Sequence, residues 1–203
     1  APREYLRAAI AACRQRGVVF VLDEMITGFR WSERGAQGLF GLDPDLSTFG
    51  KALANGHSVS ALAGRRELME AGGLDTAKDR VFLLSATHGA ETHGLAAAIE
   101  TMRIAASEDV ARQLMRLMRQ GARLRRQVAE VVAASGVGDA VGTAGRDCNL
   151  VFWTRDPDGH ASQPFRTLFL QELTRRGVLA PSFVVTTAHT DEVVDQTTEA
   201  VAG

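Results

Sequence analysis

The chain has 203 residues, of which 45% are hydrophobic and 23% are charged, and its formal net charge is -1. This composition is ordinary for a globular protein with a buried core, and it excludes a chain that is disordered throughout. The near-neutral charge gives no electrostatic reason to expect nucleic acid or an anionic membrane surface as a partner, so we expect a protein that acts on small molecules. No apolar run reaches the roughly 20 residues that a membrane helix needs.

The cysteines and histidines predict neither disulfides nor a metal site. Cys13 and Cys148 lie far apart without paired spacing, which fits the reducing cytoplasm. His88 and His93 stand five residues apart, off the i, i+4 spacing that places two ligands together on a helix, and no acidic partner is obvious.

The chain opens on Ala1 directly before a helix-like segment, and we expect it to be internal to a longer gene product.

The first part of the chain alternates helix and strand patterns, as α/β proteins do. Apolar residues recur at helical spacing over 2–16, and Gly17 supplies the stop. Residues 18–22 form a continuous apolar run of β-formers, which is typical of a strand covered on both faces in a parallel sheet. A Gly-rich loop over 30–42 follows. The remaining candidates are strands at 44–49, 60–64 and 81–85, a helix from about residue 65, and an Ala-rich helix from the turn at 87–89 to about residue 106.

A long amphipathic helix comes next. Its apolar face runs from Val110 to Val132, and the helix ends at Ser135 and Gly136. Arginines share the opposite face, which we interpret as solvated or as an interface rather than as a nucleic-acid patch, because the chain as a whole is not basic. These are Arg112, Arg116, Arg119, Arg123, Arg125 and Arg126.

The end of the chain mixes strand and helix patterns. Thr190 is the expected N-cap of the last helix, with acidic residues in its first turn. We place a domain boundary at about residue 120, which gives parts 1–120 and 121–203. The predicted elements beyond the long helix are strands at 140–141, 149–153 and 178–179 and helices at 165–176 and 191–202.

Two residues at strand ends carry the chemistry. Asp23 follows the apolar strand, and Lys51 follows the strand candidate at 44–49. Ligands of open α/β sheets collect at the carboxyl ends of strands. A pyridoxal 5'-phosphate (PLP) enzyme needs a carboxylate that keeps the cofactor's pyridine nitrogen protonated and a lysine that forms a Schiff base with its aldehyde. The alternative interpretation is that Asp23 and Glu24 merely end a strand and that Lys51 is solvated.

Two sequence blocks carry a family resemblance. Residues 22–30 read LDEMITGFR, and residues 44–51 read PDLSTFGK. With these blocks the chain resembles the class III PLP-dependent aminotransferases, and within them the glutamate-1-semialdehyde 2,1-aminomutase branch. The resemblance implies an α/β fold of the fold type I class, with 1–120 as the later part of a mostly parallel large-domain sheet and 121–203 as an α+β C-terminal small domain. Further matching blocks lie at 64–66, 85–87, 96–97, 177–182 and 188–191.

The resemblance assigns roles to four residues. It makes Asp23 the partner of the pyridine nitrogen and Lys51 the Schiff-base lysine. Met25 falls where a side chain packs against one face of the cofactor ring, although a methionine beside a buried strand also fits a plain core residue. Thr87 matches a threonine that reaches the cofactor phosphate of the neighbouring subunit, which implies a homodimer with a shared site; the alternative is an N-cap of the Ala-rich helix.

The chain also departs from the family pattern. Ala90-Glu91-Thr92 stands where members often have Gly-Asn-Pro, and Ser58 and Ser60 replace a common Pro and Gly. These changes leave the cofactor chemistry intact and bear on the substrate, because loops of this kind border the site. Nothing in the chain supplies the phosphate-cradling loop, or the aromatic ring stacked on the other face of the cofactor, that the resemblance places in the first half of the subunit. We therefore expect about half of a subunit, which needs the missing N-terminal half as a partner.

The implied activity is amino-group transfer between or within small molecules that carry amino and keto or aldehyde groups. Lys51 must lose its proton near neutrality to move a proton between the substrate carbon and the cofactor's C4' carbon, whereas Asp23 must stay ionised. Pyridoxamine 5'-phosphate is the alternate form of the cofactor. Two alternatives stay open: a non-catalytic half-subunit that acts only in assembly, and a PLP decarboxylase or racemase on the same fold, which the class III blocks disfavour.

Overall fold

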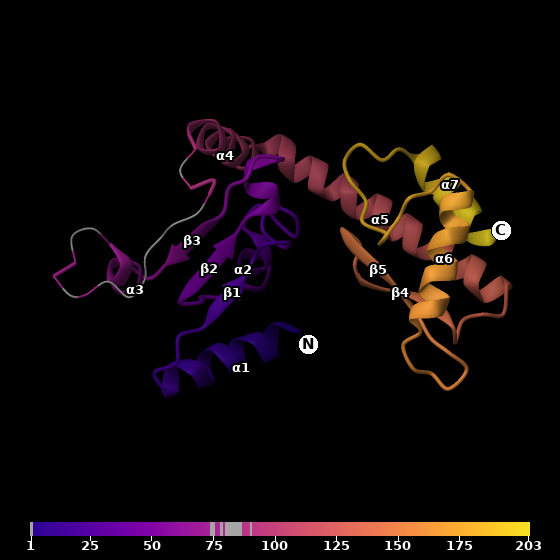
Figure 1. The fold of residues 1–203 in the computed structure, drawn as a ribbon, viewed down its shortest axis with the longest axis horizontal. Helices are drawn as coiled ribbons and strands as arrows, with labels where there is room; N and C mark the ends of the chain where they lie inside the picture. Colours follow the sequence, from indigo (N-terminus) through magenta and orange to yellow (C-terminus); the bar gives the residue numbers. More distant parts are fainter. Residues whose placement is uncertain (1, 74–75, 78, 80–86, 90) are drawn as a thin grey trace. The chain divides into compact units, whose positions relative to one another are not determined.

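The computed structural model describes residues 2–73, 76–77, 79, 87–89 and 91–203 (Figure 1). The chain divides into two compact units, Ala1–Ala111 and Arg112–Gly203. Assignment of 1–120 to a large domain and of 121–203 to a small domain stays a prediction, and the expected strand at 81–85 lies outside the described residues. None of the helices in the described ranges combines the length and the apolar character that a membrane crossing requires.

The first unit contains a three-stranded sheet in the order β1-β2-β3, made of β1 (Val21–Asp23), β2 (Leu46–Phe49) and β3 (Ala61–Gly64). Strands β1 and β2 are parallel, and β3 runs antiparallel to β2. All three strands were expected from the sequence.

The first strand is shorter and less covered than its apolar run predicted. It begins only at Val21, which is 50% exposed, and Val18 and Val19 before it are 52% and 45% exposed. Within the described residues β1 is paired with β2 alone. The coverage on both faces that the sequence predicted is therefore not provided by this part of the chain.

Helices precede, connect and follow the strands of the first unit. Helix α1 (Pro2–Gln15) is followed by Gly17, which adopts a left-handed conformation with φ of 64°. Helix α2 (Gly35–Phe40) lies in the segment that we expected to be a loop. A one-turn 3-10 helix, η1 (Lys51–Ala54), follows β2. The others are α3 (Arg66–Met69), η2 (Glu70–Gly72) and α4 (Thr92–Ala105).

A small core joins α4 to η1. Leu53 and Ala54 of η1 and Ala98 of α4 are buried together. Gly94 permits the close approach at the start of α4, because a Cβ on it would lie 2.8 Å from a methyl carbon of Val59. The loop that begins at Lys51 is thereby packed against a long helix of the same unit.

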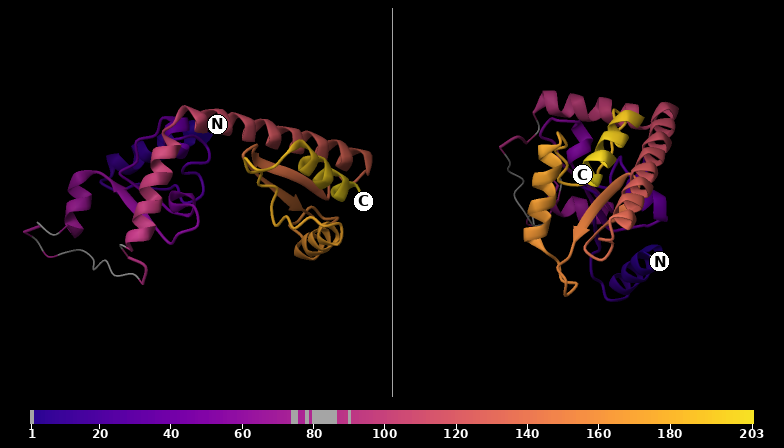
Figure 2. Two further views of the ribbon diagram at one scale, coloured as in Figure 1. Left: turned by 90° about the horizontal axis from the view of Figure 1, so that it is seen from above. Right: turned by 90° about the vertical axis from the view of Figure 1, so that its right-hand side faces the viewer.

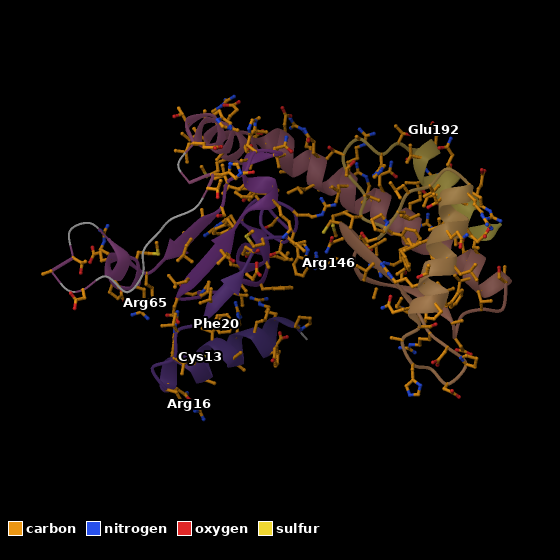
Figure 3. All side chains as sticks on the ribbon, in the orientation of Figure 1. Cys13, Arg16, Phe20, Arg65, Arg146 and Glu192 are labelled. Atoms are coloured by element: carbon orange, nitrogen blue, oxygen red, sulfur yellow. The ribbon has the colours of Figure 1, made fainter. Side chains whose placement is uncertain are left out.

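Asp45 links the three strands of the first unit through a buried carboxylate. Its Oδ2 accepts a hydrogen bond of 2.8 Å from the N–H of Phe20, and its Oδ1 accepts one of 2.8 Å from Arg65 Nη1. Figure 3 labels Phe20 and Arg65 in this unit. The N–H of Arg65 also donates to the Asp45 carbonyl oxygen. The Phe20 N–H and the Arg65 guanidinium hold the pKa of the Asp45 carboxyl below its usual range. Asp45 is only 2% exposed, so this carboxylate is satisfied entirely by the protein around it.

The second unit packs helices on both sides of a β-hairpin. Helix α5 (Glu108–Ala134) precedes the antiparallel strands β4 (Val141–Arg146) and β5 (Asn149–Thr154). Helices α6 (Gln163–Arg175) and α7 (Asp191–Ala202) follow. Figure 2 shows the hairpin lying between α5 and α6. Every helix predicted for this part of the chain is present, within one or two residues at most ends.

Aromatic rings fill the centre of the second unit. The ring of Phe152 lies 5.0 Å from that of Phe169 and 5.2 Å from that of Phe183. The predicted strand at 178–179 is not formed. Instead Phe183 makes an isolated antiparallel bridge to Leu150, which is fully buried. The segment after α6 therefore pairs with the hairpin at Phe183, a few residues after the strand that the apolar pattern predicted.

Two of the arginines that we placed on a solvated face bind other elements. Arg123 pairs with Asp191 at 3.0 Å and with Asp195 at 2.8 Å, both on α7. Arg125 pairs with Asp147 in the hairpin turn at 2.7 Å. These two side chains belong to the internal packing of the second unit, so the interpretation as a solvated face is wrong for them.

Thr190 precedes the last helix, as expected, but it does not cap it with its side chain. It occupies the N-cap position of α7, and its hydroxyl accepts no capping hydrogen bond. The hydroxyl instead interacts with Glu192, where it lowers the pKa of that carboxyl.

Candidate active site

The two residues expected to carry the chemistry lie at neighbouring strand ends. Asp23 is the last residue of β1, and Lys51 follows the end of β2 by two residues. The strands β1 and β2 lie side by side and are parallel (Figure 1). Asp23 stands opposite Thr48 in their register. Because parallel strands end at the same edge of a sheet, the fold brings the acid and the amine to one edge, as the sequence predicted.

Asp23 has one oxygen that is bound and one that is open. Its Oδ1 accepts hydrogen bonds from the N–H of Met25 at 2.9 Å and from Thr48 Oγ1 at 3.3 Å. Its Oδ2 accepts none from any residue in the described ranges, and the side chain is exposed. The protein therefore orients this carboxylate and leaves Oδ2 able to accept a hydrogen bond from a ligand.

Thr48 is a site residue that the sequence did not reveal. Its hydroxyl binds the Asp23 carboxylate, and its carbonyl oxygen accepts a hydrogen bond of 3.0 Å from the N–H of Glu24. Only the register of β1 against β2 shows this, because nothing in the local sequence links residues 25 positions apart.

Lys51 has an unusual backbone and an unpaired amine. Its φ is 47°, in the left-handed region that non-glycine residues seldom adopt, at a cost of roughly 1–3 kcal/mol. The side chain is exposed, and its amine forms no hydrogen bond or ion pair with the rest of the described chain. Strain of this kind collects at functional sites, and an unpaired amine is what a covalently bound cofactor needs.

Met25 contacts the loop of the lysine. Its side chain is half-buried and lies so close to Gly50 that a Cβ on Gly50 would overlap the methionine's terminal methyl group. Gly50 is the residue before Lys51, so the contact joins the end of β1 to the start of η1. The role of Met25 against the cofactor ring stays a prediction.

Thr87 lies in an exposed turn at 87–89. Helix α4 begins only at Thr92, with Glu91 in the N-cap position, so the alternative that Thr87 caps this helix is wrong. Among the described residues no hydrogen bond joins Thr87 to the other candidate site residues. Its role at a phosphate, in a neighbouring subunit, stays a prediction.

The histidines near this turn share an acidic partner that we did not expect. Glu91 accepts from His88 Nδ1 at 3.1 Å and approaches His93 Nε2 at 3.3 Å. The hydrogen bond from His88 lowers the pKa of the Glu91 carboxyl. The ring of His93 also lies 5.4 Å from that of His57. The side chain of Glu91 is thus occupied by its neighbours, which explains why it leaves the first N–H groups of α4 uncapped.

Glu24 differs sharply from its neighbour Asp23. It is 1% exposed, and its carboxylate accepts hydrogen bonds from the N–H groups of Ala36 at 2.9 Å and Gln37 at 2.7 Å. The hydroxyl of Thr27 donates to the same carboxylate. The sequence allows both Asp23 and Glu24 simply to end a strand, whereas the structure distinguishes the exposed carboxylate of Asp23 from the buried, hydrogen-bonded carboxylate of Glu24.

Acidic side chains also gather in the loop between β5 and α6. Ligand atoms of Asp156, Asp158 and His160 lie within 4.8 Å of one another. Asp156 Oδ1 accepts hydrogen bonds from the N–H groups of the other two residues, at 3.0 and 2.9 Å. The carboxylate therefore organises its own loop, and the expectation of a protein without bound metal stays a prediction.

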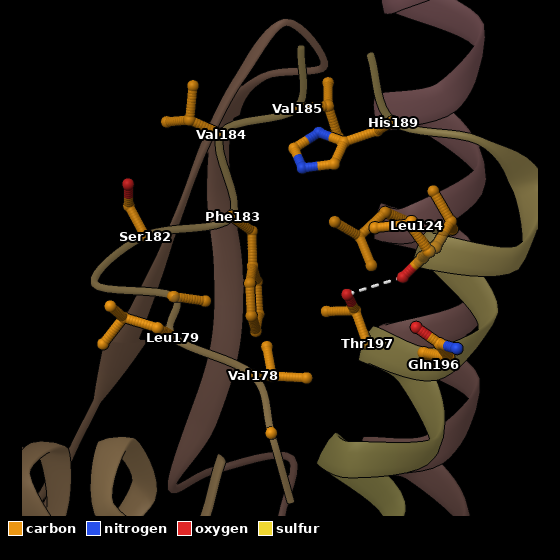
Figure 4. A pocket seen from close by; sticks show the side chains of 14 residues that line it. Leu124, Val178, Leu179, Ser182, Phe183, Val184, Val185, His189, Gln196 and Thr197 are labelled. Atoms are coloured by element: carbon orange, nitrogen blue, oxygen red, sulfur yellow. Dashed lines mark hydrogen bonds between the residues drawn. The ribbon is translucent and has the colours of Figure 1, made fainter. Parts of the chain in front are cut away.

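The second unit contains a cavity of about 250 Å³. It lies between the segment 177–185 and helix α7, with the rings of Phe183 and His189 on its walls (Figure 4). His189 Nδ1 accepts a hydrogen bond of 2.8 Å from the N–H of Thr186. The residues that line this cavity include no carboxylate and no amine, so the groups that the expected chemistry needs are those of the first unit.

Comparison with known proteins identifies the relatives of this chain. Residues 1–201 match the family model described as aminotransferase class-III. A 3-aminobutyryl-CoA aminotransferase of Cloacimonas acidaminovorans is 34% identical over 200 residues, which cover 97% of this chain and 46% of that protein. A glutamate-1-semialdehyde 2,1-aminomutase of Thermus thermophilus is 34% identical over 211 residues, which cover 98% of this chain and 48% of that protein.

A solved structure shows the same fold. The FumI protein of Sphingopyxis sp. MTA144, determined in its PLP internal aldimine form, matches with a TM-score of 0.81 and 27% identity over 98% of this chain and 45% of that one. The chain thus spans about half the length of the relatives it matches. It is an α/β fragment of fold type I, corresponds to the C-terminal portion of these proteins and belongs to the class III aminotransferase family.

Proposed function

We propose that this chain contributes Asp23 and Lys51 to the active site of a PLP-dependent aminotransferase or of an enzyme similar to glutamate-1-semialdehyde 2,1-aminomutase. One observation carries the proposal: Asp23 and Lys51 follow the ends of two parallel strands at one edge of the sheet, and the described residues leave Asp23 Oδ2 and the Lys51 amine without a hydrogen-bond partner. PLP, when bound, supplies a pyridine ring that acts as an electron sink and an aldehyde that reacts with amines. The Asp23 carboxylate at this edge fits the pyridine ring, and the Lys51 amine fits the aldehyde.

In this proposal Asp23 acts as an electrostatic anchor. Its Oδ2 would accept a hydrogen bond from the protonated pyridine nitrogen, while the Met25 N–H and Thr48 Oγ1 hold Oδ1 in place. A carboxylate that is oriented before the ligand arrives needs no reorganisation during the reaction, which is the main advantage of preorganised electrostatics.

Lys51 would both hold the cofactor and move a proton. Its Nζ would bind the cofactor's aldehyde carbon and, once released by the substrate amine, would carry a proton between the substrate carbon and the cofactor's C4' atom. Met25, which contacts the Lys51 loop through Gly50, would pack on one face of the ring. Pyridoxamine 5'-phosphate would be the cofactor's alternate form.

The remaining features of the proposal concern assembly and substrate. Thr87 would reach the phosphate of the neighbouring subunit in a homodimer, and the missing N-terminal half of the subunit would complete the phosphate site. The relatives named as an aminotransferase and as an aminomutase support small amino compounds and their keto or aldehyde counterparts as substrates. Both cysteines are free, which is consistent with action in the cytoplasm.

Exposed apolar side chains support a second candidate, a half-subunit that acts only in assembly. Val21 on β1 is 50% exposed, and Ile99 on α4 is 64% exposed. Apolar surface of this kind marks places where another chain binds. This candidate needs no chemistry at Asp23 or Lys51, and it therefore predicts that substitutions at these two residues leave assembly unchanged.

The test uses the fact that Lys51 and Lys78 are the two lysines of the chain. The protein is incubated with PLP, alone and together with the N-terminal half of a relative's subunit, and is then reduced with borohydride. We expect a cofactor adduct that mass spectrometry locates on Lys51, that disappears in Lys51→Ala and that persists in the matched control Lys78→Ala. Absence of the adduct from the assembled protein would reject the proposed function in favour of the assembly candidate.

A further inference from the structure

We propose that Glu24 is a positioning residue for Asp23, and that through Asp23 it controls the protonation of the PLP pyridine nitrogen. The inference rests on the proposed function and adds a residue to it. Glu24 is a buried carboxylate that the proposed chemistry does not use, next to the acid that it does use.

Three donors from two segments hold the Glu24 side chain. The N–H groups of Ala36 and Gln37, at the start of α2, bind its two oxygens, and the Thr27 hydroxyl binds one of them as well. Among the described residues, N–H and O–H groups alone bind the two oxygens of this buried side chain.

The glycine that starts α2 is adapted to this carboxylate. A Cβ on Gly35 would lie 2.6 Å from Glu24 Oε2, and its φ of 66° is left-handed. No other residue type fits there without displacing the Glu24 side chain. The start of α2 therefore packs closely around the Glu24 carboxylate and holds the Glu24 side chain in one position.

The backbone of Glu24 is fixed too. Its N–H donates to the carbonyl oxygen of Thr48 at 3.0 Å, and its own carbonyl oxygen accepts from the N–H of Gly28 at 2.8 Å. Side chains of successive residues in an extended segment point to opposite faces. With the Glu24 side chain directed into the protein, that of Asp23 is directed to the opposite, exposed side.

Release of the Glu24 side chain would therefore act on Asp23. The 23–25 segment would lose its inward anchor, and the Met25 N–H that binds Asp23 Oδ1 would move with it. The open Oδ2 would then no longer be held in one direction. A pyridine nitrogen facing a misdirected carboxylate loses the stabilisation of its bound proton.

The principal test compares Glu24→Gln with Glu33→Gln in the PLP-loaded protein. Both variants replace one carboxylate by an amide of the same shape, but Glu33 is exposed and forms no hydrogen bond with the described residues. In Glu24→Gln an amide NH₂ meets a backbone N–H, so one donor of α2 loses its acceptor. The readout is the pH titration of the pyridine nitrogen, followed by 15N NMR of ring-labelled PLP.

We expect the titration midpoint to fall by about one pH unit in Glu24→Gln, a tenfold change in proton affinity, with kcat lowered and KM little changed. We expect Glu33→Gln to match the wild type. A purely structural role would lower the melting temperature and leave the midpoint in place, and that result would overturn the inference.

If the Glu24→Gln protein does not fold, a milder variant tests the same inference. Thr27→Val removes the hydroxyl donor and keeps the shape, so it should shift the midpoint in the same direction by a smaller amount; an unchanged midpoint would count against the inference. If wild-type protein forms no PLP adduct on Lys51, the proposed function fails. If it forms the adduct and Glu24→Gln titrates like wild type, only the positioning role fails.

Discussion

Gly121 on α5 packs directly against the carbonyl oxygen of Asp147 in the β4–β5 turn. A Cβ on Gly121 would overlap that backbone oxygen, which cannot move aside as a flexible side chain could. The neighbouring ion pair between Arg125 and Asp147 holds the two elements at this distance. The lack of a side chain at Gly121 thus permits the close spacing between α5 and the hairpin.

We therefore expect Gly121→Ala to destabilise the protein by about 1–3 kcal/mol, the range for overpacking of a tight contact. Gly138→Ala is the matched control, because Gly138 has no neighbour within 4 Å of its Cβ position and its φ is not left-handed. Urea unfolding followed by circular dichroism measures both. Equal stability of the two variants would contradict the packing described for Gly121.

Asp45 predicts an acid-sensitive contribution to stability. Its folded-state pKa lies below the usual 3.8 because of the Phe20 N–H and the Arg65 guanidinium. A depressed pKa gives a contribution that is fully present above the unfolded-state value and is lost as the pH falls through the folded-state value. We expect the melting temperature of wild type to decline below about pH 4, and Asp45→Asn to lower it at neutral pH and flatten that decline. Asp43→Asn, which changes an exposed carboxylate two residues away, should retain the wild-type profile.

Leu150 is the centre of the second unit's core and is fully buried. Truncation to alanine leaves a cavity and removes buried apolar surface, so we expect a loss of about 2–5 kcal/mol. Val151 follows it on β5 with its side chain 43% exposed, and Val151→Ala should cost clearly less. Thermal and urea unfolding of the two variants measure the difference, and a comparable loss in both would be inconsistent with the burial pattern of β5.

Asp23→Asn tests the charge at the proposed cofactor site. The substitution keeps size and hydrogen-bonding reach but removes the negative charge, and we expect amino-group transfer to fall by about 100–1000-fold, as for other preorganised electrostatic groups. Thr48→Val removes one of the two donors to Asp23 and should produce a smaller fall. Rates measured with an amino donor and a keto or aldehyde acceptor provide the comparison. Wild-type rates in Asp23→Asn would exclude a role for the charge.

Much of the fold was predictable because its elements carry local patterns. The helical periodicity of α1, α5 and α7 and the apolar or β-branched runs of β2 and β5 each indicate one structure. The strand ends at Asp23 and Lys51 were also predictable, since parallel strands share their carboxyl edge. Helix α2 was not, because its start depends on the Glu24 carboxylate, 12 and 13 residues before the N–H groups that it binds.

The other differences between the sequence-based predictions and the structure also come from contacts between residues far apart in the chain. Arg123 is one of several similar arginines on α5, and only the approach of α7 distinguishes it from exposed ones. Thr48 becomes part of the site through strand register. The segment at 178–179 has the apolar residues of a strand, but the contact with Leu150 forms at Phe183. In each case a partner far along the chain decides the outcome, and single-sequence patterns describe only near neighbours.

The exposed side of β1 also affects how the isolated chain behaves in solution. Within the described residues this strand offers its backbone groups to β2 on one side only, and Val21 stands half exposed beside the other. An unprotected strand edge is a template for self-association. The apparent molar mass of the isolated chain, measured by light scattering, should therefore rise with protein concentration, and Val21→Lys should suppress that rise without changing the fold.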